Sequence, residues 1–304
     1  MTDALRVSDE VAAALAAGRP VVALESTIFS NLGLPSPANR EALDRCVGAV
    51  RAGGAVPAVT AVLDGVARVG LTADEHDRIL GSARKVAARD VPVAVAQRWA
   101  LGATTVSASL LLAARAGIAV FATGGIGGVH RGVEVTGDVS ADLDAIAGWP
   151  VVTVCAGAKV FLDLARTLEH LETAGVPVLG WRTDELPAFT VRSSGLPVPH
   201  RVDAAAEVAA VVRADVALGR VGGVLVTVPI PDDDALPRAD VEAALASALA
   251  DAERDGLSGA AITPFVLGRI AAATDGRSVP ANLALAEHNA AVAAEIAVAL
   301  AGPA

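Results

Sequence analysis

Lysine is nearly absent from this sequence. Of the 24 basic residues, 22 are arginine, and Lys85 and Lys159 are the only lysines. Where a positive charge alone is needed, the chain uses arginine. A lysine amine can lose its proton and attack an electrophilic carbon, whereas an arginine guanidinium stays protonated. Lys159 is therefore a candidate for chemistry that arginine cannot perform, whereas Lys85 lies at a predicted helix end, where a cation is favourable.

Aromatic residues and net positive charge are also lacking. Aromatic side chains make up 3% of the chain, tyrosine is absent, and the net charge is −10. Single-stranded nucleic acids stack on aromatic side chains, and phosphate backbones bind basic surfaces. We therefore expect no nucleic-acid partner. An acidic protein can still bind a small anionic metabolite in a locally positive pocket, so a small-molecule substrate remains open.

Cysteines and long apolar runs are few. Cys46 and Cys155 form neither a CxxC motif nor a disulfide framework, which favours a reducing, cytoplasmic setting and two buried apolar side chains. The first residues lack the pattern of a secretory signal. No uninterrupted apolar run of about 18 residues occurs, because Glu287 and Glu295 interrupt the stretch 282–301. We therefore expect no membrane-spanning helix and no membrane partner.

Short valine-rich runs alternate with longer segments of helical periodicity. The predicted strands cover residues 21–27, 56–63, 66–69, 91–96, 118–125, 150–157, 176–181 and 221–230. The predicted helices cover residues 8–17, 39–52, 72–83, 104–116, 140–147, 159–174, 202–218, 238–255, 262–273 and 280–301. Most strands are continuous apolar runs, as expected for strands covered on both faces. This order predicts one domain over residues 1–304, a layered α/β/α sandwich with a mostly parallel central sheet.

Turn and cap residues support these elements. Asp64 and Gly65 separate two strands and predict a hairpin. Five polar residues are placed to cap helices, namely Ser8, Asn39, Thr72, Ser140 and Asp203. The proline- and aspartate-rich stretch 229–239 predicts a loop, either a solvated turn or a lid over a site.

In parallel sheets, ligands bind beyond the carboxyl ends of the strands. Glu25 directly follows the apolar run 21–24 at such an end. A carboxylate there is costly unless it is hydrogen-bonded or used. Partial burial would raise its pKa and suit a general acid, while a structural ion pair is the alternative.

The next strand end carries the glycine-rich sequence FATGGIGGVHRG (121–132), which includes His130 and Arg131. Glycines let backbone N–H groups approach a ligand and can form an anion-binding nest. The spacing fits neither a P-loop nor a dinucleotide fingerprint. The stretch therefore predicts anion binding, with simple turn chemistry as the alternative.

Three aspartates, Asp138, Asp142 and Asp144, crowd one short segment beside Ser140. Crowded oxygen ligands suit Mg²⁺ or Mn²⁺, but acidic residues also favour a helix start. Lys159 follows the strand 150–155, and a cation at the start of the helix predicted from residue 159 would oppose the helix dipole. A partly desolvated, reactive amine explains this lysine better than a solvent-facing one.

Together these motifs resemble one family, the pseudouridine-5'-phosphate glycosidases, also called indigoidine-synthase-A-like proteins. The resemblance runs from about residue 6 to about residue 300, and "FATGGIGGVHRG…DVSADL" with "VCAGAK" are its most specific parts. The other matching stretches are ALESTI (23–28), RKVAARD (84–90), PAFTVRSSG (187–195), PIP (229–231), TPFVLGRIAAAT (263–274) and NLALAEHNAAVAAEIA (282–297).

The resemblance implies reversible cleavage of the C–C glycosidic bond of pseudouridine 5'-phosphate to uracil and ribose 5-phosphate. It also implies a divalent metal, usually Mn²⁺ with Mg²⁺ as a substitute, and a homotrimer. Matched position by position, Lys159 is the Schiff-base lysine, Glu25 the general acid and Asp138 the metal ligand. The implied substrate-binding residues are Lys85, Val106, Ser140, Ala141, Asp142 and Asn282, and His130 is a further candidate cation for the phosphate.

One departure from the family pattern affects the mouth of the pocket. After ESTI and Phe29 the chain reads SNLGLPSP (30–37), one residue longer than the family's usual run and without the histidine and the aromatic residue that relatives often have there. Other readings therefore stay open: an imine-forming aldolase-like enzyme, a non-catalytic sugar-phosphate sensor, and a glycosidase for a related C- or N-linked ribosyl phosphate.

Overall fold

A computed structural model of the chain describes residues 4–257 and 262–302. Its strands are β1 (Leu5–Val7), β2 (Val21–Leu24), β3 (Val56–Leu63), β4 (Val66–Val69), β5 (Arg84–Val86), β6 (Leu101–Thr104), β7 (Val120–Ala122), β8 (Val152–Cys155), β9 (Val178–Trp181), β10 (His200–Val202) and β11 (Val224–Thr227). Its helices are α1 (Asp9–Ala16), α2 (Ala38–Ala52), α3 (Ala73–Ile79), α4 (Val91–Ala96), α5 (Val106–Ala116), α6 (Val133–Thr136), α7 (Ala141–Gly148), α8 (Leu164–Thr173), α9 (Ala205–Ala217), α10 (Arg238–Arg254), α11 (Ile262–Ala273) and α12 (Ser278–Ala301). Two 3₁₀ helices, η1 (Ala88–Asp90) and η2 (Asp232–Asp234), complete the fold.

The strands form one sheet in the order β1-β4-β3-β2-β7-β8-β11-β9-β10, with β6 paired to β3 and β5 paired to β6. From β3 to β10 all neighbours on this path run parallel. β3 also pairs antiparallel with β4 and with β6, one on each edge, because both partners pair with residues 61–63. The predicted mostly parallel sheet is thus confirmed.

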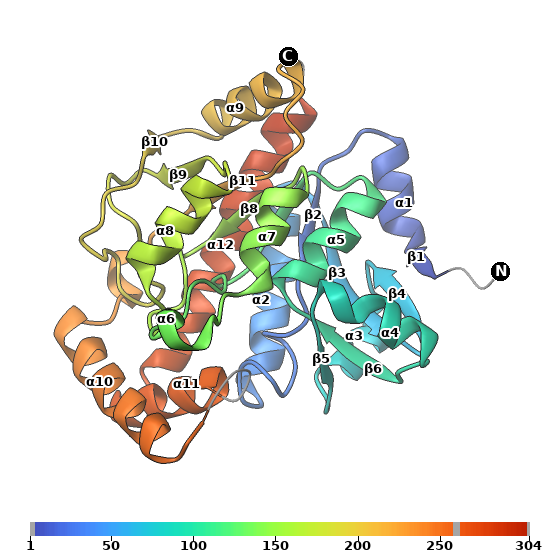
Figure 1. Cartoon of the computed structure of the whole chain (residues 1–304). Coiled ribbons are helices and arrows are strands. Elements are labelled where there is room, and N and C mark those ends of the chain that lie inside the picture. Colours follow the sequence, from blue (N-terminus) through green and yellow to red (C-terminus); the bar gives the residue numbers. More distant parts are fainter. Residues whose placement is uncertain (1–3, 258–261, 303–304) are drawn as a thin grey trace.

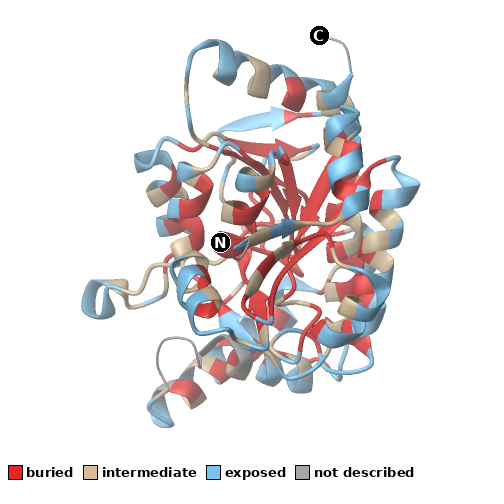
Figure 2. Ribbon diagram, turned by 90° about the vertical axis from the view of Figure 1, so that its right-hand side faces the viewer, coloured by how far each residue is buried: buried red, intermediate tan, exposed pale blue. Residues whose placement is uncertain are grey.

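Helices cover both faces of this sheet (Figure 1). On β2, Val22 and Leu24 pack into a core with α2 and α12. Val21 and Ala23 point to the opposite face and pack into a core with α1, α5 and α7. Buried residues fill the sheet and its helix contacts, whereas the outer helix surfaces are exposed (Figure 2). Side chains alternate along a strand, so a continuous apolar run supplies both cores and explains the three-layer fold.

The β3–β4 hairpin is confirmed in detail. Asp64 and Gly65 have φ values of 52° and 76°, the left-handed pair that a two-residue hairpin turn requires. The caps Ser8, Thr72 and Ser140 are also confirmed, because each side chain accepts a backbone N–H of the first helical turn.

Two other cap predictions are wrong. Asn39 lies inside α2, and its amide donates instead to the carbonyl oxygens of Phe29 and Leu80. Helix α9 is preceded by Ala204 rather than Asp203. In both cases tertiary packing moves the helix boundary by one or two residues.

The strand predicted over residues 91–96 is also wrong, because this segment is helix α4. Val91 and Ala94 are buried, whereas Val93 is 42% exposed. That i, i+3 pattern is helical, and Pro92 is tolerated in the first turn. A six-residue apolar run does not distinguish the two structures by itself. The short strands β1, β5, β6 and β10 were not predicted.

Helix α12 runs across the sheet and packs against α2, α9, β2 and β7. Among the described residues it is the one helix that is long and apolar enough to cross a membrane, and most of its most apolar window is buried inside the protein. Burial on this scale identifies it as a core helix of the fold. It brings the asparagines of its first turns to the site described next.

Candidate active site

The carboxyl ends of three neighbouring parallel strands place the predicted catalytic residues at one edge of the sheet. Glu25 follows β2, Thr123 follows β7, and the turn after β8 leads to Lys159. Strand β7 lies between β2 and β8. The two loops beyond β7 and β8 stay paired: the Ile126 N–H donates to the Gly157 carbonyl oxygen, and the Lys159 N–H donates to that of Ile126.

Glu25 is buried, with 7% of its surface exposed. Its Oε1 accepts a hydrogen bond from the Thr123 hydroxyl. Burial raises the pKa of Glu25 above its ordinary value, while the charge of Lys159 and the Thr123 hydrogen bond oppose that rise. The predicted rise is therefore present, and its main cause is desolvation. A carboxyl group that keeps its proton to higher pH is suited to general-acid catalysis.

Lys159 is half-buried, and its charge acts on the Glu25 carboxyl group. The predicted helix start at residue 159 is wrong. Helix α8 begins at Leu164, where the Asp163 side chain accepts the Arg166 N–H at 3.0 Å. Lys159 lies in the preceding turn, so the helix dipole gives no argument about its amine. Lys159 remains a candidate for the reactive amine because it lies beside the buried Glu25 carboxyl group.

Gly157 shapes the turn before Lys159. It has a φ of 81°, and a Cβ placed on it would lie 2.2 Å from the Pro187 carbonyl oxygen. We expect Gly157→Ala to lower the free energy of unfolding by about 3 kcal/mol or more, because backbone strain and a backbone clash combine. Gly175→Ala is the matched control: its φ is 71°, but nothing lies within 4 Å of the added Cβ. Urea titration of both variants measures the difference, and equal losses would contradict the clash.

The glycine-rich loop is built differently from the predicted anion nest. None of its glycines at positions 124, 125, 127 and 128 has a positive φ, which a nest requires. Five of its N–H groups already donate to protein acceptors, those of Thr123, Ile126, Gly127, Val129 and His130. The four central glycines therefore do not form the predicted nest, and Gly132, with a φ of 77°, is the one glycine of the stretch 121–132 with a positive φ.

Close packing explains these glycines instead. A Cβ on Gly125 would lie 2.7 Å from the Phe189 ring, and one on Gly127 would lie 2.2 Å from the Ser140 Oγ. Phe189 itself has a φ of 63°, which is rare for a bulky residue. No sequence pattern other than the family motif points to Phe189, because only the fold brings this residue onto the loop.

Asp142 joins the loop to a helix end. Its Oδ1 accepts the Ser107 N–H at 3.0 Å, and its Oδ2 accepts the Gly127 N–H at 2.9 Å. Ser140 caps the helix that carries Ala141 and Asp142, and Val106 is the first residue of α5. Four of the predicted substrate-binding residues therefore lie around the facing N-termini of α5 and α7.

We expect Asp142→Asn to destabilise the protein by about 2 kcal/mol, because the amide NH₂ must face one of two backbone N–H donors. Asp144→Asn is the matched control, since the Asp144 side chain is 85% exposed two residues along the same helix. Thermal unfolding of both variants measures this. A loss in Asp144→Asn as large as in Asp142→Asn would contradict the role of the two backbone donors.

Lys85 reaches the same region from a neighbouring strand. It is exposed on β5, and the Val86 carbonyl oxygen accepts the Thr105 N–H at the start of α5. Its charge also lowers the pKa of Glu25, although less than that of Lys159 does. The structure thus brings both lysines of the chain to one carboxyl group.

Asp138 and His130 lie together at the outer end of the loop. The His130 Nδ1 lies 3.8 Å from the Asp138 Oδ2, and the Asp138 side chain is 36% exposed. Residues 4–257 and 262–302 contain no group of three or more His, Cys, Asp or Glu side chains that could hold a metal ion. This donor set does not fit a protein cage. It does fit a hydrated Mn²⁺- or Mg²⁺-type ion held by one carboxylate.

Asn282 lies in the first turns of α12, where its Nδ2 donates to the Ser278 carbonyl oxygen at 2.9 Å. One turn later, Ala286 lines a small cavity beside Glu25 and Thr123. Because residues four apart share a helix face, Asn282 lies on the face of α12 that points to this site. Asn289, which sequence reasoning missed, lies two turns along and contacts the site loop directly.

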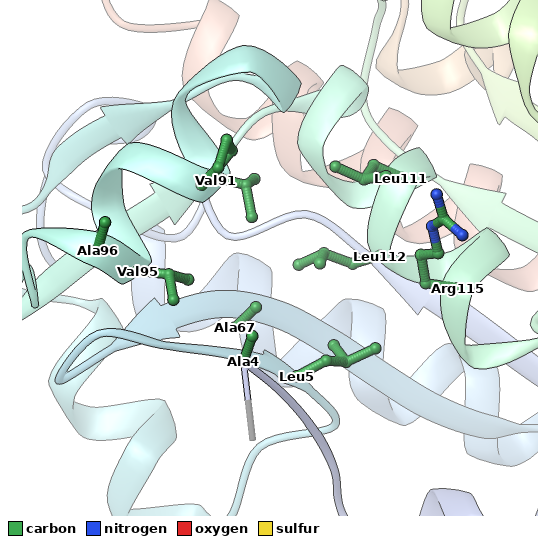
Figure 3. Close-up of a pocket in the computed structure, with 10 residues that line it drawn as sticks. Ala4, Leu5, Ala67, Val91, Val95, Ala96, Leu111, Leu112 and Arg115 are labelled. Carbon is green, nitrogen blue, oxygen red and sulfur yellow. The ribbon is translucent and has the colours of Figure 1, made fainter. Parts of the chain in front are cut away.

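The cavity beside Glu25 measures only about 10 Å³, room for at most one water. A larger cavity of about 400 Å³ lies between β1, α4 and α5, lined by Leu5, Val91, Leu112 and Arg115 among others (Figure 3). That lining is apolar apart from Arg115 and includes none of the predicted site residues. The predicted site residues therefore lie at the sheet edge and not in this cavity.

Cys155 is the residue that most resembles a nucleophile in the motif VCAGAK. Burial raises the pKa of its thiol to about 12. A thiol with that pKa stays protonated at neutral pH and is unreactive. Cys155 packs in the core, as the sequence predicts.

The fold and the site together define an α/β enzyme that pairs a buried carboxyl group with a lysine amine at the carboxyl edge of a parallel sheet. A family model described as "Indigoidine synthase A like protein" matches residues 10–299, and the chain belongs to that family.

Its relatives cover the whole fold. The pseudouridine-5'-phosphate glycosidase of Rhodospirillum centenum is 57% identical over 302 residues, which cover 99% of this chain and 94% of that protein. The protein of the same name from Myxococcus xanthus is 52% identical, with 98% of each chain covered. The crystal structure of the prealnumycin C-glycosynthase AlnA in complex with ribulose 5-phosphate is 43% identical, with a TM-score of 0.90, and covers 98% of this chain and 97% of that one.

Proposed function

We propose that this protein reversibly cleaves the C–C glycosidic bond of pseudouridine 5'-phosphate, giving uracil and ribose 5-phosphate. The observation that carries the proposal is the buried, proton-retaining Glu25 beside Lys159. Relatives that are 50–57% identical over nearly the whole chain and are named for this activity support the choice of substrate.

The bond to be broken joins C1' of the ribose to C5 of uracil, and carbon is a poor leaving atom. In the proposed mechanism the neutral Lys159 amine attacks C1', while Glu25 protonates the ring oxygen as the C1'–O bond breaks. The lysine nitrogen then donates its electron pair to C1', and uracil leaves as its C5 takes a proton. Water hydrolyses the resulting iminium, which releases ribose 5-phosphate and restores the amine.

The phosphate group of the substrate needs positive charge and N–H donors. We place it near Lys85 and the N-terminus of α5, since half of the N–H groups of residues 123–132 already donate to protein acceptors. Helix N-termini and lysine ammonium groups both bind phosphate. His130, Ser140, Ala141 and Asn282 complete the proposed binding surface.

A metal ion is part of the proposal. Asp138 would hold Mn²⁺, or Mg²⁺, mostly through waters, and the ion would supply positive charge near the substrate's oxygens. Isothermal titration of Mn²⁺ into wild-type protein and Asp138→Asn tests this without any activity. We expect the wild type to bind one ion per subunit and the variant to lose that binding. The resemblance further supports a homotrimer and a cytoplasmic setting.

Chromatographic detection of uracil released from pseudouridine 5'-phosphate, with and without Mn²⁺, tests the function. Release of free uracil together with ribose 5-phosphate is the expected result. Cleavage within the sugar without uracil would instead indicate an aldolase-like enzyme. Binding of ribose 5-phosphate without any turnover would indicate a sensor.

A second candidate is synthesis or cleavage of another ribosyl phosphate bond, C- or N-linked. It is favoured by the C-glycosynthase relative and by the altered SNLGLPSP stretch after Glu25. Incubating the protein with ribose 5-phosphate and either uracil or prealnumycin distinguishes the two, because only the favoured acceptor is consumed.

A further inference from the structure

Asn289 is a buried amide that contacts the loop after β7. It lies on α12 with 1% of its surface exposed. Its Nδ2 donates to the Thr123 carbonyl oxygen at 2.8 Å and to the Gly124 carbonyl oxygen at 3.2 Å. Because both partners are acceptors, only the NH₂ end of the amide can face them. The orientation of the side chain therefore follows from its partners.

The buried Asn289 amide lowers the stability of the folded protein. Within the described residues its Oδ1 is buried without a hydrogen-bond partner. A buried polar atom without a hydrogen-bond partner lowers the stability of the folded state. An apolar residue would avoid that cost, so the position is not optimised for stability alone. What the asparagine contributes is the two hydrogen bonds that its NH₂ group donates to the Thr123 and Gly124 carbonyl oxygens.

The two carbonyl groups belong to the residues that connect Glu25 to the Lys159 loop. The Thr123 hydroxyl donates to Glu25, and the Thr123 N–H donates to the Val154 carbonyl oxygen. The Gly124 carbonyl oxygen also accepts the Ala156 N–H at 3.0 Å, in the turn that leads to Lys159. Asn289, on α12, thus holds the peptide that connects the residue next to the acid with the turn that leads to the amine.

We propose that Asn289 is a positioning residue for the acid: through its two hydrogen bonds to the Thr123 and Gly124 carbonyl groups it holds the Thr123 hydroxyl on the Glu25 carboxyl group. The inference builds on the proposed function, because it gives the Glu25 proton a role. Asn289 is too deeply buried to contact substrate, so it acts through Thr123.

Two variants remove the donors without adding charge. Asn289→Leu keeps the branched shape and the number of heavy atoms but is bulkier, and Asn289→Ala leaves a cavity but cannot clash. Asn39→Leu is the matched control, since Asn39 is 3% exposed and also donates to two backbone carbonyl oxygens, those of Phe29 and Leu80. Asn39→Leu therefore removes the same kind of hydrogen bonds from another buried site, one that does not involve Thr123 or Gly124.

The decisive measurement is the titration of the Glu25 carboxyl carbon by NMR in protein labelled at glutamate, with Glu25→Gln to assign the signal. The Thr123 hydrogen bond holds the pKa of Glu25 down, so both Asn289 variants should raise it by about half a unit or more. Asn39→Leu should leave the titration where the wild type has it. Identical titrations in the wild type and in both Asn289 variants would overturn the proposal.

Turnover separates this inference from the proposed function. In an active wild type, we expect each Asn289 variant to lower kcat about tenfold with KM within about twofold, and to move the alkaline limb of the pH profile upward. A wild type that releases no uracil refutes the proposed function, while the Glu25 titration still decides the role of Asn289. If every buried-amide variant lowers kcat equally without moving the limb, Asn289 has only a structural role.

Discussion

Replacing Lys159 by arginine will abolish uracil release. Arginine keeps the positive charge and the length of the side chain but cannot become a neutral amine, so no imine forms. Loss of a covalent nucleophile costs several orders of magnitude, and we expect kcat to fall by about 1,000-fold or more. The assay is release of uracil from pseudouridine 5'-phosphate under saturating substrate.

Borohydride reduction gives the direct test of the imine. With ribose 5-phosphate and borohydride, the wild type should gain one ribityl phosphate adduct, which peptide mass spectrometry should place on Lys159. Lys85→Arg is the matched control, because Lys85 is the chain's other lysine and lies near the same carboxyl group. It should weaken substrate binding and still form the adduct. Full uracil release by Lys159→Arg would refute the covalent mechanism.

Replacing Glu25 by glutamine will remove the general acid, and we expect kcat to fall by about 100- to 10,000-fold. In the wild type the acid must be protonated to act. Because burial raises the pKa of Glu25, activity should persist above the usual range of a carboxyl group and fall as the pH rises through that raised pKa. A pH profile of kcat/KM measures the alkaline limb, which Glu25→Gln should lack.

The same substitution should stabilise the protein. A carboxyl group whose pKa is raised on folding favours the folded state at low pH, and this contribution is lost as the pH rises through the folded pKa. Burial disfavours the ionised form that the carboxyl group has in the unfolded chain at neutral pH, so Glu25→Gln removes this cost, and we expect about 1 kcal/mol of added stability. The exposed Glu172→Gln should change the melting temperature little. Lower stability in Glu25→Gln would show that Glu25 has a structural ion-pair role.

Much of the fold follows from local patterns. Continuous valine-rich runs such as 21–24 and 152–155 predict strands covered on both faces, and such strands require helices above and below. The Asp64–Gly65 turn fixes its hairpin because few other residues adopt two positive φ values. The strand predicted over residues 91–96 was wrong because a run of six apolar residues is compatible with a strand or a helix. Which of the two forms depends on the residues that the fold buries.

In the candidate site, too, the sequence predicts some residues and not others. Glu25 and Lys159 could be predicted because each is an unusual residue at a strand end, and the family motifs name them. Neither the role of the glycines nor that of Asn289 could be predicted. A glycine-rich stretch fits a nest and a close-packed loop equally well, and the difference lies in the Phe189 ring and the Ser140 side chain that contact it.

The sequence by itself determined the three-layer architecture, the two catalytic candidates and the family, because these depend on local periodicity and on motifs. The tertiary structure alone decided that Glu25 is desolvated, that the Thr123 hydroxyl contacts it, and that Asn289 approaches that threonine from a helix 166 residues further along the chain. The physical reason is that a pKa and a hydrogen bond depend on what surrounds a group in space. For residues so far apart in the chain, only the folded sheet brings those surroundings together.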